Sequence, residues 1–90
     1  MIRMVLKGRC IDSGRITEED GSSSLFADIV DETTKEEITV KVLLPEGTDL
    51  DDRVEEVSEW STDGGIVTAS VTISNGEHAC EIERFIVEFP

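Results

Sequence analysis

The feature that most constrains the fold of this 90-residue chain is an Asn-Gly pair that follows a strictly alternating stretch. Between residues 67 and 74 aliphatic side chains alternate with Ser and Thr, and Asn75-Gly76 comes next. Alternation with a period of two is typical of a β-strand with one buried and one exposed face. Asn-Gly favours a two-residue hairpin turn, because both residues accept a positive φ. The sequence therefore predicts an antiparallel hairpin with the pairs Ser74–Glu77, Val71–Cys80 and Ala69–Ile82.

The strand that returns from this turn is expected to reach Phe89. Its apolar positions are even-numbered up to Ile82 and odd-numbered from Phe85 onward. One extra residue in a strand exchanges its two faces. We therefore expect a bulge near Glu83-Arg84.

Three earlier stretches alternate in the same way and predict strands over residues 2–10, 25–30 and 38–44. The polar stretch from Asp12 to Ser24 lies between the first two of them. It contains two glycines and a run of acidic residues followed by serines, which is typical of a flexible loop.

The segment from Thr48 to Thr62 has the period of an α-helix instead. Its apolar residues Leu50, Val54, Val57 and Trp60 lie on one helical face. Thr48 is the expected N-cap, and the acidic residues that follow it suit the positive end of the helix dipole. We expect the large ring of Trp60 to anchor this helix in the core.

This order of elements predicts a mainly β domain that spans residues 1–90. Three strands, one helix and two strands is the order of the five-stranded OB-fold, a Greek-key barrel with the helix between strands 3 and 4. Closure of the barrel would also remove the exposed edges of Val-rich strands. An open sheet with the helix on one face is the alternative. Since only 4% of the residues are aromatic, either core must be aliphatic.

The chain is strongly acidic, but its N-terminal segment is basic. The 21 acidic and eight basic side chains give a formal charge of −13. The first fifteen residues contain four basic residues and one acid, a charge of +3. Three explanations of the acidity stay open: a basic partner, imitation of a nucleic-acid backbone, or a salt-rich cytoplasm. The composition resembles that of haloarchaeal and other halophilic proteins, which favours the third.

Parts of the chain resemble the small single-stranded-DNA-binding proteins of filamentous phages. The resemblance rests on Met1-Ile2-Arg3, on the strand end from Val40 to Gly47, and on the stretch from Gly65 to Pro90. It implies an OB-fold, a dimer, and binding of single strands without sequence preference through aromatic and basic side chains. This chain differs from that family in having no Tyr and an overall acidic composition.

The leading functional hypothesis is single-stranded nucleic-acid binding on the face of strands 1 to 3. Alternation turns Phe26 outward on a sheet that also carries most of the basic residues, so a base could stack on it. The candidate nucleic-acid-binding residues are Arg3, Lys7, Arg9, Arg15, Phe26 and Lys41. The same face has an apolar patch of Val5, Phe26 and Leu43, which could instead be covered by a second copy in a homodimer.

The alternative hypothesis, from a different class, is a protein-interaction module or nucleic-acid mimic. Its binding surface would be the acidic helix over residues 49–59, facing a basic protein partner. The candidate residues of this surface are Asp49, Asp52, Glu55, Glu56 and Glu59.

Catalysis is not expected, because no nucleophile elbow or paired-carboxylate spacing organises the Ser, His and Asp residues. No metal or cofactor site is expected either, since Cys10 and Cys80 lack metal-ligand spacing and fit buried reduced thiols. The chain has no apolar run of membrane-spanning length and no N-terminal signal pattern, so a cytoplasmic location is expected.

Overall fold

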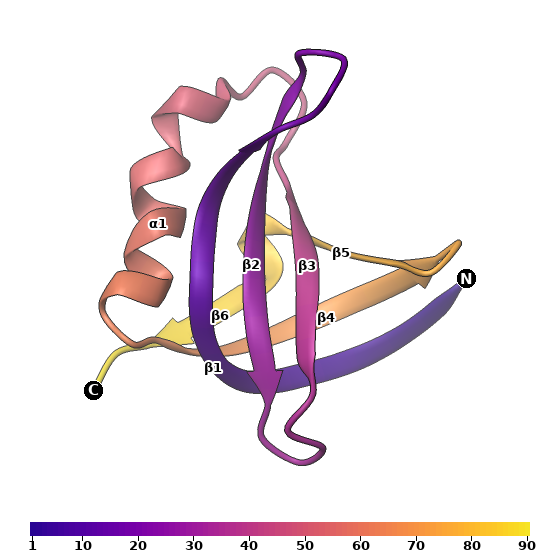
Figure 1. Ribbon diagram of the computed structural model, residues 1–90, viewed down its shortest axis with the longest axis vertical. Coiled ribbons are helices and arrows are strands. Elements are labelled where there is room, and N and C mark those ends of the chain that lie inside the picture. Colours follow the sequence, from indigo (N-terminus) through magenta and orange to yellow (C-terminus); the bar gives the residue numbers. More distant parts are fainter.

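The computed structural model describes residues 1–90, and the chain is mainly β with a single α-helix (Figure 1). The strands are β1 (Ile2–Thr17), β2 (Ser23–Asp31), β3 (Glu37–Leu43), β4 (Ile66–Ser74), β5 (Glu77–Glu81) and β6 (Phe85–Glu88). The helices are the α-helix α1 (Val54–Thr62) and two 3-10 turns, η1 (Leu50–Asp52) and η2 (Ile82–Arg84).

Five of the strands close into a barrel. The strand order is β1-β2-β3-β5-β4, and β4 pairs in turn with β1. All these pairings are antiparallel except that of β3 with β5, which is parallel. The prediction of a mainly β, closed five-stranded barrel with one helix is confirmed, and the open-sheet alternative is wrong. The strand expected to run from Glu77 to Phe89 is divided into β5 and the short β6, and β6 pairs with β4 alone.

The strand β1 is much longer than expected, because it serves two parts of the barrel. Its first half pairs with β4 and its second half with β2, and the two ladders meet at Gly8 and Arg9. The register with β2 shifts between Cys10 and Asp12, which marks a bulge at Ile11. The expected loop from Asp12 to Ser24 is therefore wrong. The connection is only five residues long, from Glu18 to Ser22.

The core is aliphatic, as the composition requires. It contains residues from all five barrel strands together with Val57, Trp60, Ile82 and Phe85. Val57 and Trp60 come from α1, which packs mainly against β1. The Trp60 and Phe85 rings lie 4.9 Å apart between centroids. The expected role of Trp60 as a core anchor is confirmed.

The helical segment is shorter than the predicted span of residues 48–62. Asp49, and not Thr48, is the capping residue, and its carboxylate accepts a hydrogen bond from the backbone N–H of Asp51 at 3.0 Å. This cap begins η1, and the α-helix starts only at Val54. Leu50 and Val54 are half-buried beside the core. No helix of the protein has the length and apolar character needed to cross a membrane.

The predicted hairpin is correct at the turn and wrong beyond it. Asn75 and Gly76 both have positive φ, and Ser74 pairs with Glu77. Pairing stops at Thr72–Ala79, and η2 then interrupts the strand before β6 resumes at Ala69–Phe85. The expected pairs Val71–Cys80 and Ala69–Ile82 are absent from the ladder. A 3-10 turn of three residues, not a bulge, produces the change of face at Phe85.

Candidate functional site

Two outward-facing parts of the barrel differ sharply in charge. One is formed by the first half of β1 and by β4, and we call it the basic wall. Its outward residues are Arg3, Val5, Lys7 and Arg9 on β1, opposite Thr72, Ser70, Thr68 and Ile66 on β4. The other is formed by the second half of β1 with β2 and β3. In Figure 1, β2 and β3 run vertically, whereas β4 and the first half of β1 run across the view.

The parts of β1 and β4 that form the basic wall contain no acidic residue. Residues 1–11 and 64–76 contain no Asp or Glu, although the whole chain has 21. The three ion pairs of the structure are Arg15–Asp51, Arg53–Glu56 and Arg84–Glu81. The cations of the wall are therefore unpaired and exposed to solvent. Thr72 and Thr68 of β4 lie opposite Arg3 and Lys7, and Ile66 lies opposite Arg9, so the wall combines positive charge with hydroxyl groups.

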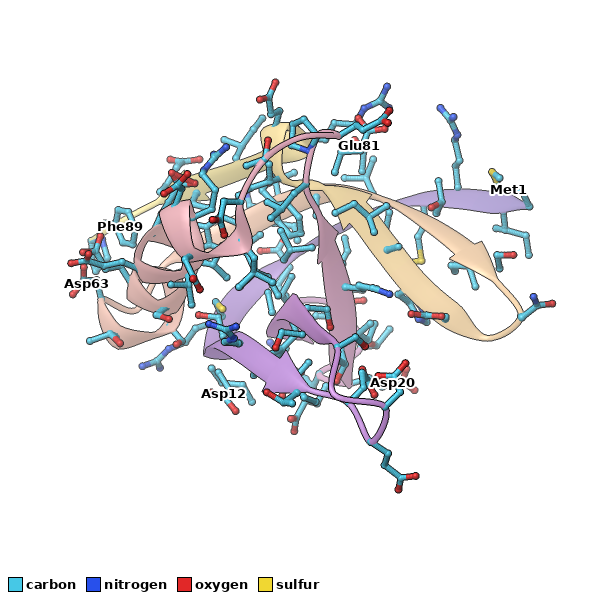
Figure 2. The ribbon with its side chains drawn as sticks, turned by 90° about the horizontal axis from the view of Figure 1, so that it is seen from above. Met1, Asp12, Asp20, Asp63, Glu81 and Phe89 are labelled. Carbon is cyan, nitrogen blue, oxygen red and sulfur yellow. The ribbon has the colours of Figure 1, made fainter.

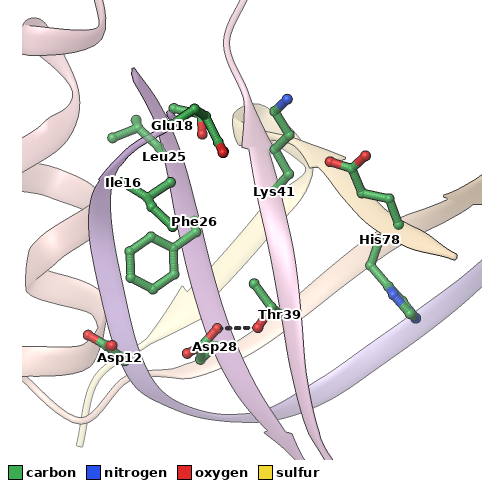
Figure 3. Close-up of a pocket in the computed structure, with 11 residues that line it drawn as sticks. Asp12, Ile16, Glu18, Leu25, Phe26, Asp28, Thr39, Lys41 and His78 are labelled. Atoms are coloured by element: carbon green, nitrogen blue, oxygen red, sulfur yellow. Dashed lines mark hydrogen bonds between the residues drawn. The ribbon is translucent and has the colours of Figure 1, made fainter. Parts of the chain in front are cut away.

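A hollow of about 370 Å³ lies on the second part of the barrel, and we call it the Phe26 pocket (Figure 3). Its lining residues are Asp12, Ile16, Glu18, Ser24, Leu25, Phe26, Asp28, Thr39, Lys41, Glu77 and His78. The Phe26 ring lies between Ile16 on one side and the carboxylates of Asp12 and Asp28 on the other. Four carboxylates and one ammonium group, that of Lys41, border the pocket. Its net charge is therefore negative.

The carboxylates of the Phe26 pocket are placed by strand pairing. Asp12 is the direct partner of Asp28 across β1 and β2. Before the bulge the even-numbered residues of β1 face inward, and the extra residue Ile11 exchanges the two faces, so Asp12 faces outward. Thr39, opposite Asp28 on β3, donates a hydrogen bond from its hydroxyl to Asp28 at 2.6 Å. Seen from above, Asp12 and Asp20 lie on the same side of the molecule, and Met1 lies at the far end of β1 (Figure 2). The acidic loop of residues 18–22 thus extends this negative surface.

The candidate nucleic-acid-binding residues do not share one face. Arg3, Lys7 and Arg9 belong to the basic wall, whereas Phe26 and Lys41 border the acidic pocket. A row of cross-strand partners connects the two parts, namely Phe26, Lys41, Ala79, Thr72 and Arg3 in that order. Three strands therefore separate Arg3 from Phe26 along this row.

Arg15 lies on neither surface. It was expected at the start of a loop, but it lies within β1 as the partner of Leu25, whose side chain is buried. Its guanidinium group contacts the carboxylate of Asp51 in η1 at 2.7 Å. Arg15 therefore ties the end of β1 to the segment before α1.

The candidate acidic residues of the helical segment are divided between η1 and α1. Asp49 caps η1 and Asp52 ends it, while Glu55, Glu56 and Glu59 lie on α1. Glu56 accepts a hydrogen bond from Arg53 at 2.9 Å. Glu55 and Glu59 are exposed. The expected continuous acidic helix over residues 49–59 is thus broken at Arg53, between η1 and α1.

The apolar patch considered for a homodimer is also divided. Val5 is 69% exposed on the basic wall, and Leu43 is 37% exposed at the end of β3. Phe26 is half-buried in its own pocket.

Both cysteines are buried free thiols. Burial raises the pKa of Cys10 and of Cys80, so neither offers a thiolate at neutral pH. No group of three or more His, Cys, Asp and Glu side chains is arranged to hold a metal ion.

The sequence patterns did not predict two features of these surfaces, the pairing of Asp12 with Asp28 and the basic wall. The pairing of Asp12 with Asp28 depends on the bulge at Ile11, which no local signal marks. The acid-free character of residues 1–11 and 64–76 is visible in the sequence. Combined with the pairing of the first and fourth strands, it would have located the basic wall.

Comparison of the chain with protein-family models, with curated proteins and with solved structures found no match.

Proposed function

We propose that this domain is an OB-fold that binds single-stranded nucleic acid through its basic wall. The OB-fold assignment is supported by the strand order β1-β2-β3-β5-β4 with closure onto β1, and by a helix between β3 and β4. OB-folds are frequent binders of oligonucleotides, but the fold alone does not define the ligand.

The observation that carries the proposal is the separation of charge on the barrel surface. Arg3, Lys7 and Arg9 are the unpaired cations of a wall that is formed by acid-free parts of β1 and β4. Cationic side chains and hydroxyl groups are the usual partners of phosphate oxygens. The exposed side chains of Val5 and Ile66 add apolar contact area between them. A flexible polyanion fits this combination of groups.

The usual nucleic-acid face of OB-folds, on strands 2 and 3, is a poor phosphate site in this chain. Its pocket has four carboxylates against Lys41, and the β1–β2 loop adds Glu19 and Asp20. Phosphate groups would be repelled there. The acids nearest to the basic wall lie at its two ends, each beside a further cation. Asp31 and Glu32 line a hollow with Arg9 and Lys35, and Glu81 lines one with Arg3 and Arg84.

The test is fluorescence anisotropy of a labelled oligothymidine of about 20 nucleotides, titrated at KCl concentrations from about 0.1 M to 2 M. The wall has no aromatic ring on which bases could stack, so phosphate contacts must supply most of the affinity. Each phosphate neutralised on a single strand contributes about −0.7 to the slope of log K against log salt, so three cations predict a slope of about −2. Absence of binding at every salt concentration at which the protein is folded would refute the proposal.

A matched pair of variants separates the basic wall from the Phe26 pocket. Lys7→Glu and Lys41→Glu change the net charge equally, and both replace an exposed and unpaired lysine. We expect Lys7→Glu to weaken binding about tenfold and to reduce the slope by about 0.7, with little effect of Lys41→Glu. The reverse result would place the bound nucleic acid on the face of β2 and β3.

A further inference from the structure

The Phe26 pocket contains an arrangement that the proposed nucleic-acid function does not use. Asp12 and Asp28 are direct cross-strand partners, so their side chains leave the sheet about 5 Å apart. Like charges in directly opposite positions destabilise a sheet. Neither carboxylate takes part in an ion pair. The free protein therefore holds two mutually repelling charges at the edge of a hollow.

The surroundings of this pair favour an organic cation as the missing partner. The Phe26 ring borders both carboxylates (Figure 3), and a cation is attracted to the face of an aromatic ring as well as to carboxylates. Thr39 fixes the direction of Asp28 through its hydrogen bond of 2.6 Å. A metal ion fits less well, because no three ligating side chains converge. Lys41 does not fill the role, since it forms no ion pair and points away from both carboxylates in Figure 3.

We propose that the Phe26 pocket binds a lysine or arginine side chain from a basic segment of a partner protein, with Asp12, Asp28 and Phe26 as its contacts. Charge complementarity extends beyond the pocket itself. Glu18 and Glu77 lie on its border, and the loop of residues 18–22 continues the acidic surface. A segment with several basic residues would meet carboxylates on both sides of the bound side chain.

This proposal does not depend on nucleic-acid binding, because the pocket and the basic wall are separate surfaces. Together they would allow the domain to hold a nucleic-acid strand and a basic protein segment at the same time.

The experiment uses a fluorescein-labelled Gly-Ser peptide that contains two arginines, and a control peptide with glutamines in their place. Anisotropy is measured for the native protein, for Asp12→Asn/Asp28→Asn, and for Glu55→Gln/Glu59→Gln. The two double variants remove the same charge, but the second removes it from exposed positions of α1. We expect the pocket variant to lose about tenfold in affinity for the arginine peptide, and the helix variant to change less than about twofold.

Equal losses in both variants would mean attraction by net charge alone, and would overturn the proposal. A larger loss in the helix variant would move the interaction to the acidic helix. Binding of free spermine as tight as that of the arginine peptide would replace the protein segment by a polyamine.

The melting temperature tests the repulsion between Asp12 and Asp28 without any peptide. Neutral asparagines should relieve the repulsion between positions 12 and 28, so the melting temperature of the free pocket variant should rise. A melting temperature equal to that of the helix variant or below it would contradict the strained pair on which the proposal rests.

Discussion

The basic wall and the Phe26 pocket are built from the same strand, yet they carry opposite charge. Up to Arg9, β1 has three cations and no acid, and its partner β4 adds hydroxyl groups. Beyond the bulge, β1 contributes Asp12, and its partner β2 contributes Asp28. A single strand therefore supplies a surface for anions in its first half and a surface for cations in its second.

This comparison shows that net charge is a poor guide to what the domain can bind. A formal charge of −13 suggests repulsion of nucleic acid everywhere on the surface. The strand pairing instead groups the acid-free segments 1–11 and 64–76 with each other. Local potential depends on which strands are neighbours, and the two neighbours that form the basic wall, β1 and β4, are far apart in the sequence.

The largest effect is expected at Gly8, where β1 passes from one partner strand to the other. A Cβ at this position would overlap the carbonyl oxygen of Val30 and lie 2.7 Å from its carbonyl carbon. Because the obstacle is backbone, it cannot move aside as a flexible side chain could. Gly8→Ala should therefore lower the free energy of unfolding by about 3 kcal/mol, the upper part of the range for overpacking. Urea denaturation followed by Trp60 fluorescence measures the change.

The matched control for this substitution is Gly21→Ala, in the β1–β2 connection, where an added Cβ meets no atom within 4 Å. Gly21 has a positive φ of 87°, so alanine should cost only about 1 kcal/mol of backbone strain. Equal losses of unfolding free energy in the two variants would show that the backbone near Gly8 can move to accept a Cβ. The basic wall and the Phe26 pocket would then not be held rigidly relative to each other.

Sequence patterns predicted several of the elements correctly, but they did not predict the surfaces. Alternation and the Asn75-Gly76 turn predicted β2, β3 and β4 to within two residues at each end. They failed for β1, because polar residues from Asp12 to Thr17 resemble a loop although they pair with β2. The binding surfaces depend on that pairing, so the sequence-based prediction placed Phe26 on the same face as four cations, Arg3, Lys7, Arg9 and Lys41.

An intermediate effect is expected when a carboxylate is placed on the basic wall. Ser70 is exposed and lies opposite Val5, between the positions of Arg3 and Lys7. Ser70→Glu should weaken single-strand binding about tenfold, or about 1.4 kcal/mol, by neutralising cations and repelling phosphate. Arginine-peptide binding at the Phe26 pocket should stay unchanged. The matched control is Thr62→Glu at the exposed end of α1, which alters the net charge equally. If both variants lose the same affinity, net charge governs binding and the contrast between the two surfaces disappears.

The smallest effect is expected for Arg15, the basic residue of β1 that belongs to neither surface. Its guanidinium group and the Asp51 carboxylate are 46% and 67% exposed, so water screens their ion pair. Exposed ion pairs contribute about 1 kcal/mol or less to stability. Arg15→Gln should therefore lower the free energy of unfolding by less than about 1 kcal/mol and leave single-strand affinity within about twofold of the native value. Lys7→Gln removes the same charge from the basic wall and should weaken binding severalfold in the same anisotropy assay. A loss at Arg15 as large as that at Lys7 would extend the strand-binding surface past the bulge toward η1, and the division of β1 into an anion-binding half and a cation-binding half would fail.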